Sequence, residues 1–139
     1  MELNENILEE KFKEYNEMYF GGKLPTPKFA FHRSFKVYGY FTCNPHASGS
    51  SVINPLISIS SYYDFNEEYL RDTLVHEMIH FKLERKKKLP KKPHGEEFLA
   101  EAARINETYG LNIKAHTKYK GIQISKTAPK HSLARWFWG

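Results

Sequence analysis

Apolar side chains recur every three or four positions in the first twenty residues. Leu8, Phe12, Tyr15 and Tyr19 share one helical face, and acidic residues lie between them. This spacing predicts an amphipathic helix over residues 4–20, and the two glycines that follow at once predict its C-terminal end.

The pattern changes to alternation between residues 29 and 60. Aromatic and β-branched residues predict two strands within residues 29–43, which we expect to pair as a hairpin. Residues 52–60 predict another strand, interrupted near Pro55 because proline cannot donate a hydrogen bond to a sheet. A short strand is also predicted over residues 122–125.

Helical spacing returns in the second half of the chain. Asp64 followed by Glu67 resembles a capping box and predicts the start of a helix that runs to about residue 86. A second helix is predicted over residues 94–109, ending before a glycine. Together with the strands, these helices predict an α+β fold in a single domain, residues 1–139.

Composition narrows the class of protein. A chain of 139 residues with 40% hydrophobic content is long enough for one core, and its apolar runs stay far below the roughly 20 residues of a membrane-spanning helix. The acidic N-terminus lacks the features of a secretory signal, so we expect a cytoplasmic protein. The single cysteine, Cys43, excludes a Cys-only zinc ribbon within this sequence, so any metal must be held mainly by histidine and carboxylate.

The net charge of +5 is unevenly placed. Residues 82–92 hold seven cations and one glutamate, a charge of +6, and residues 111–139 hold six cations and no acid, another +6, so the remainder carries −7. Two basic segments on an acidic body indicate an anionic partner, of which nucleic acid is the commonest. The alternative is a pair of solvated loops.

The strongest chemical signal is the sequence HEMIH at residues 76–80. Histidines four apart on a helix lie about 40° apart around its axis, so His76 and His80 can reach one ion. Glu77 lies about 60° beyond His80 and can face the same ion without binding it. Apolar residues fill the opposite half of this helix: Leu70, Leu74, Val75, Met78, Ile79 and Phe81.

A catalytic zinc ion takes three protein ligands and keeps one open position. His94, at the start of the next helix, is the best candidate for the third ligand. Glu97, Glu101 and Cys43 are the alternatives. Zinc at such a site polarises a scissile carbonyl and activates water, and Glu77 is placed to act as the general base. An oxyanion-stabilising tyrosine or histidine is expected within residues 94–120, whereas the other histidines are expected to be structural or exposed.

Four stretches make the chain resemble the SprT-like family, the metallopeptidase domain of bacterial SprT proteins and eukaryotic Spartan. They are residues 15–25 (YNEMYFGGKLP), 73–80 (TLVHEMIH), 94–98 (HGEEF) and 104–106 (RIN). The resemblance spans about residues 8–110. It implies a zincin-like domain with one Zn²⁺ ion on His76, His80 and His94, Glu77 as general base, and cleavage of proteins crosslinked to DNA.

The chain departs from this family where many members continue into a Cys-based zinc ribbon that helps to engage DNA. The basic loop and the basic C-terminal extension, about residues 111–139, can replace it electrostatically, and the terminal tryptophans can stack on unpaired bases. These features favour single-stranded over duplex DNA; the alternative for the tryptophans is packing on the domain itself. The candidate contacts are Arg85, Lys86, Lys87, Lys88, Lys91, Lys92, Trp136 and Trp138.

The sequence therefore predicts a monomeric zinc endopeptidase that acts on protein substrates and has no membrane partner. Two other functions stay open. One is a nucleic-acid-binding module whose zinc site is structural or silent. The other is a metal hydrolase acting on a formyl group, for which Cys43 rather than His94 would bind the metal.

Overall fold

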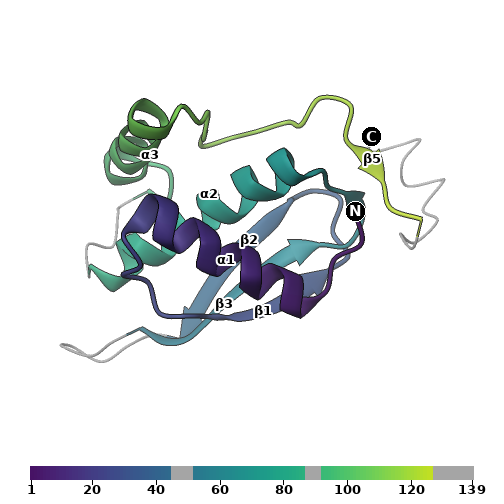
Figure 1. The fold of residues 1–139 in the computed structure, drawn as a ribbon, viewed down its shortest axis with the longest axis horizontal. Helices are drawn as coiled ribbons and strands as arrows, with labels where there is room; N and C mark the ends of the chain where they lie inside the picture. The colour runs from purple at the N-terminus through teal and green to yellow at the C-terminus, as the bar shows by residue number, and fades with distance from the viewer. Residues whose placement is uncertain (45–51, 87–91, 127–139) are drawn as a thin grey trace.

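The structure, a computed structural model, describes residues 1–44, 52–86 and 92–126. Within these ranges the chain forms helices and short strands in the order of an α+β domain, as the sequence predicts (Figure 1). The helices are α1 (Glu5–Phe20), α2 (Glu67–Arg85) and α3 (Glu96–Tyr109). The strands are β1 (Lys28–His32), β2 (Gly39–Asn44), β3 (Ile53–Ser60), β4 (Tyr63–Asp64) and β5 (Gln123–Ile124).

The larger sheet has the order β1-β3-β2, with β1 parallel and β2 antiparallel to β3. The predicted hairpin between the first two strands is therefore wrong, because β3 lies between them. Alternation identifies a strand but not its partner. Strand β3 is the central strand, with a neighbour along each edge. Its Ile57 and Ile59 side chains are fully buried, as suits that position.

Strand β3 runs through Pro55, and the predicted interruption takes the form of a bulge. The register between β2 and β3 shifts between Thr42 and Asn44, and Asn54 has a left-handed backbone with φ of 50°. Pairing with β1 begins only at Leu56, so Pro55 lies beyond the part of β3 that has a partner on that side.

Helix α2 begins two residues later than the predicted capping box places it. The side chain of Asn66, not that of Asp64, caps the helix by accepting a 2.8 Å hydrogen bond from the amide of Tyr69. Asp64 instead ends β4, where it pairs with Gln123 of β5. The predicted capping box is wrong because Asp64 is still part of a strand, so the helix starts later and Asn66 becomes its N-cap.

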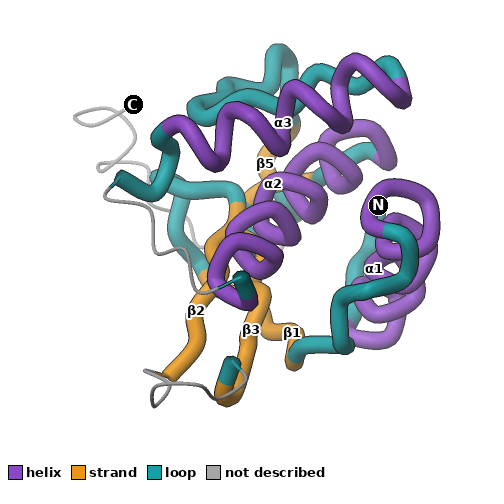
Figure 2. Tube along the Cα trace, turned by 90° about the vertical axis from the view of Figure 1, so that its left-hand side faces the viewer, coloured by secondary structure: helices purple, strands orange, loops and turns teal. Residues whose placement is uncertain are grey.

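Helices α1 and α2 cover one face of the larger sheet, and α3 packs against α2, which lies at the centre of the molecule (Figures 1 and 2). Helix α2 contacts α1, α3, β2 and β3. The apolar side predicted for it is fully buried, with no exposed area at Leu70, Leu74, Val75, Met78, Ile79 or Phe81. With its apolar side packed in the core, α2 can turn in only one way, and this directs His76, Glu77 and His80 towards a cavity. Within the described ranges, every helix is too short or too polar to cross a membrane.

After α3 the chain turns at Gly110, whose left-handed φ of 72° suits glycine. Residues 111–122 then return along α2 towards β5 (Figure 1). This return places residues distant in sequence beside the HEMIH stretch.

Candidate metal centre

Three histidines converge on one point. Helix α2 presents His76 and His80 one turn apart, and the segment before α3 brings His94 to them. The Nε2 atoms lie 3.3 Å apart between His80 and His76, 3.2 Å between His80 and His94, and 3.2 Å between His94 and His76. These three residues form a cluster that can hold a metal ion.

The spacing fits a tetrahedral ion. Zinc–nitrogen bonds of 2.0–2.1 Å at the tetrahedral angle separate two ligand nitrogens by about 3.3 Å. Burial, with smaller contributions from the neighbouring imidazoles, lowers the pKa of His76 to about 3 and that of His80 to about 4. The pKa of His94 is lowered for the same reasons. At neutral pH the three rings are therefore uncharged, as metal ligands must be.

The other candidate ligands are not part of this cluster. The Cys43 thiol donates a hydrogen bond to Glu84 over 3.5 Å, Glu97 is exposed on α3, and Glu101 is held in ion pairs. Among the described residues, His94 is the one that completes the histidine pair. The formyl hydrolase reading depends on Cys43 as a ligand, so the geometry gives it no support.

Glu77 is buried beside the cluster, with 5% of its surface exposed. Burial raises the pKa of its carboxyl from 4.5 to about 8. Glu77 lines a cavity of about 580 Å³ together with all three histidines. This position, beside the cluster and outside it, is the one that the helical spacing predicts.

The opposite wall of this cavity is strand β2. Residues 39–43 line it in unbroken succession, with Glu84 and Pro93 at other points on the wall. Strand β2 is at one edge of the sheet, and among the described residues its strand partner is β3 alone. The cleft thus places a sheet edge opposite the histidine cluster.

Phe98 of α3 supports the cluster from within the core, a role that sequence reasoning missed. Its ring is fully buried, and its centroid lies 4.7 Å from that of His76, 4.9 Å from that of His80 and 5.0 Å from that of His94. The sequence did contain a signal for this role, because Phe98 follows His94 by one helical turn and lies on the apolar face of α3. The aromatic ring limits the positions that the three imidazoles can take.

The returning segment adds two further groups. The carbonyl oxygen of Lys114 lies 3.0 Å from Nδ1 of His76, and the exposed ring of His116 lies 5.0 Å from that of His94. A backbone carbonyl leaves no signal in a sequence. His116 does lie in the region where an oxyanion-stabilising group is expected, and with Tyr119 it lines a second cavity beside Glu77.

Glu101 ties α2 to α3. Its carboxylate is 9% exposed; Lys82 donates to it over 2.6 Å, and Arg104 donates both to it and to the carbonyl oxygen of Tyr19. Burial acts to raise the pKa of Glu101, but the bonds and charges of Lys82 and Arg104 outweigh it and lower the pKa.

Replacing Glu101 with glutamine is expected to destabilise the metal-free protein by about 2 kcal/mol at pH 7, because two charge-assisted hydrogen bonds weaken. Since the folded pKa of Glu101 lies below the ordinary value of 4.5, this contribution is present above that value and lost as the pH falls through the folded pKa. Urea unfolding at pH 7 and pH 3 measures the difference. The exposed Glu97→Gln variant is the control and should match the wild type; an equal loss in both variants would contradict the role of the ion pairs.

The predicted nucleic-acid contacts are only partly within the described residues. Arg85 donates a 2.8 Å hydrogen bond to the carbonyl oxygen of Lys23, Lys86 is the C-cap of α2, and Lys92 is exposed. Lys87, Lys88, Lys91, Trp136 and Trp138 lie outside the described residues. Arg85 and Lys86 line a cavity of about 560 Å³ that contains three further cations: Lys23, Lys82 and Arg104.

The fold and the cluster define an α+β domain with a three-histidine site able to hold a metal ion. The profile of the SprT-like family matches residues 8–125, most of the chain. The protein therefore belongs to the SprT-like family, as its motifs indicate. A search of the curated proteins found no match.

Proposed function

We propose that this protein is a zinc-dependent endopeptidase with a zincin-like site. The observation that carries the proposal is the meeting of three imidazole Nε2 atoms within 3.3 Å of one another beside a buried glutamate, in one open cleft. Membership of a family of metallopeptidase-type domains supports the same conclusion.

The roles follow from the positions of the side chains. His76, His80 and His94 would hold the ion through Nε2. A zinc ion there supplies Lewis acidity towards a carbonyl oxygen and towards water. Glu77 would take a proton from the attacking water on its carboxylate and pass it to the leaving amine nitrogen. A cation in the cluster favours the ionised, basic form of Glu77, which burial alone disfavours.

The shape of the cleft supports a polypeptide substrate. Strand β2 borders the cleft, and within residues 1–44, 52–86 and 92–126 no strand pairs with its other edge. An extended peptide can add to such an edge through backbone hydrogen bonds, independently of its side chains. The scissile bond would then lie between β2 and α2, where the histidines and Glu77 face the cleft.

A second proposal concerns the partner. The cavity lined by Lys23, Lys82, Arg85, Lys86 and Arg104 gathers five cations, and Glu101 neutralises only part of this charge. Such a surface favours a phosphate backbone. It supports the proposal that the substrates are proteins associated with DNA or crosslinked to it.

The test uses the full chain loaded with one equivalent of zinc and an unfolded protein as substrate. We expect cleavage that stops when a chelator removes the metal and returns when zinc is restored. Cleavage that continues after complete zinc removal would contradict the proposal.

A parallel titration with a single-stranded oligonucleotide at increasing salt tests the partner: binding should weaken steeply, and Arg85→Gln should reduce the salt slope by about one. Oligonucleotide binding without proteolysis would instead favour a nucleic-acid-binding module.

A further inference from the structure

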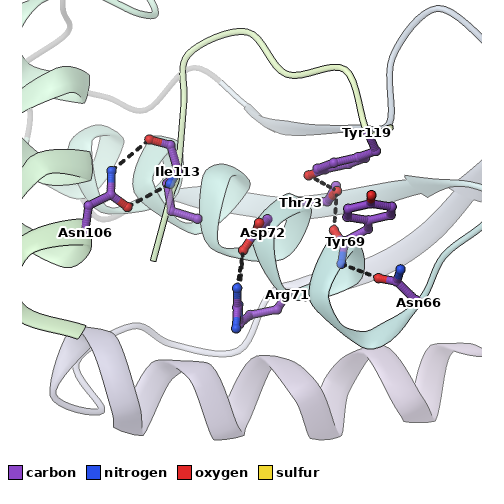
Figure 3. A network of polar contacts seen from close by, with 8 residues as sticks. All are labelled: Asn66, Tyr69, Arg71, Asp72, Thr73, Asn106, Ile113 and Tyr119. Carbon is purple, nitrogen blue, oxygen red and sulfur yellow. Dashed lines mark hydrogen bonds and ion pairs between the residues drawn. The ribbon is translucent and has the colours of Figure 1, made fainter. Parts of the chain in front are cut away.

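The segment that returns along α2 is fixed to the body of the protein at two points (Figure 3). At the first, the Asn106 side chain accepts a 2.7 Å hydrogen bond from the amide of Ile113 and donates a 3.0 Å bond to its carbonyl oxygen. At the second, the hydroxyls of Tyr119 and Thr73 lie 2.8 Å apart, and the Tyr119 ring stacks on Tyr69 at 4.4 Å.

Between these two anchors lies the carbonyl of Lys114, 3.0 Å from Nδ1 of His76. A carbonyl oxygen can only accept, so His76 must carry its proton on Nδ1, which leaves the Nε2 lone pair directed at the cluster. Among the described residues, His76 is the cluster member whose Nδ1 has a hydrogen-bond partner. The Lys114 carbonyl therefore fixes both the tautomer and the ring orientation of His76.

Asn106 hydrogen-bonds to Ile113, the residue immediately before Lys114. Its two hydrogen bonds restrain the peptide planes on both sides of the Ile113 Cα atom, and the Ile113 side chain is buried. Because peptide units are planar, only the φ and ψ angles of Lys114 separate the second of these planes from the Lys114 carbonyl. Loss of the Asn106 side chain would release both planes.

We propose that Asn106 is a positioning residue for the metal centre: through Ile113 it holds the Lys114 carbonyl that orients His76. This inference rests on the proposed metal site. Outer partners of metal-binding histidines fix the ring and the tautomer, and removing them lowers metal affinity by about 10–100-fold.

The chain contains a matched control in Asn16. The side chain of Asn16 donates to the carbonyl oxygen of Leu24 over 2.8 Å and accepts from its amide over 3.2 Å. This is the same pair of bonds that Asn106 makes to Ile113, but it joins α1 to the loop that follows it, and Leu24 lines a different cavity from the one that holds the three histidines.

The experiment compares zinc affinity by competition with a chelator at neutral pH for the wild type, Asn106→Ala and Asn16→Ala, each shown to be folded. We expect Asn106→Ala to bind zinc about 10–100-fold more weakly and Asn16→Ala to bind it as the wild type does. Equal affinities in all three proteins would overturn the proposal, as would an equal loss in both variants. If Asn106→Ala does not fold, Asn106→Asp takes its place: it keeps the acceptor for the Ile113 amide, loses the donor to the Ile113 carbonyl, and should bind zinc more weakly than the wild type and Asn16→Ala. An affinity equal to that of the wild type would then overturn the proposal.

A second readout needs no metal. Nitrogen-15 NMR of the metal-free protein at pH 8 should show the His76 ring protonated on Nδ1 in the wild type and in Asn16→Ala, and a mixture of tautomers in Asn106→Ala. An unchanged tautomer in Asn106→Ala would count against the role of Asn106. A wild type that shows this tautomer but binds no zinc would instead remove the proposed metal centre, so the two failures are distinguishable.

Discussion

Replacing Glu77 with glutamine is expected to reduce peptide cleavage by about 10²–10⁴-fold while leaving the bound zinc in place. Glutamine has nearly the same shape as glutamate but cannot take a proton from water. The histidine cluster does not include Glu77, so the metal should remain. Single-turnover cleavage rates and metal content, measured on the same preparations, check both parts of this expectation.

The Glu97→Gln variant is the matched control, because Glu97 is an exposed glutamate on α3 outside the cleft. It should retain wild-type activity and zinc. Full activity in Glu77→Gln would remove Glu77 from the mechanism. Loss of zinc together with activity in that variant would mean that Glu77 contributes to metal binding.

The same Glu77 substitution changes the pH dependence of stability in the metal-free protein. Burial raises the Glu77 pKa from 4.5 to about 8, so between these values the folded chain holds a proton that the unfolded chain has released. The contribution of Glu77 to stability is therefore present below the unfolded pKa and is lost as the pH rises through about 8. Glu77→Gln removes this loss. The free energy of unfolding of the variant, measured with urea and compared with that of the wild type, should therefore increase from pH 5 to pH 8.

Replacing His94 with alanine is expected to abolish stoichiometric zinc binding and, with it, cleavage. His94 supplies one of the three Nε2 atoms and comes from outside α2, so its loss leaves a pair of ligands on one helix. The decrease in affinity should exceed the 10–100-fold typical of losing an outer partner. Metal analysis after dialysis against a weak chelator measures it.

Two substitutions serve as controls for His94. Cys43→Ser and Glu97→Ala alter the other candidate ligands, and both should keep one zinc per chain because neither side chain reaches the cluster. A Cys43→Ser variant without metal, combined with a His94→Ala variant that retains it, would restore the formyl hydrolase reading. Retention of zinc by all three variants would require a ligand that the cluster does not contain.

The sequence predicts those parts of the fold that depend on near neighbours along the chain. The predicted ends of the first helix, near residue 4 and at the two glycines, agree with the bounds of α1. The burial of one side of α2 is confirmed at each predicted apolar position. Such features follow from the 3.6-residue period of a helix and from the conformations of glycine, which act within a few residues.

Pairing between distant segments is where prediction failed. The two strands expected to form a hairpin are separated by β3, which comes later in the chain. Four consecutive residues of β3 are buried, as suits a strand with a neighbour along each edge, and alternation within one strand does not say which strands those neighbours are. The cap of α2 at Asn66 was missed for a related reason, since the strand pairing of Asp64 takes that residue out of the helix.

By itself, the sequence determined that two histidines and a glutamate lie on the polar side of a buried helix, because residues 76, 77 and 80 are joined by local helical geometry. Only the tertiary structure decided that His94 meets them, that burial raises the pKa of Glu77, and that the Lys114 carbonyl lies against His76. These outcomes depend on how α3 and the returning segment pack on α2. Contacts between segments so far apart are fixed by the packing of the whole core rather than by the spacing of residues along the chain.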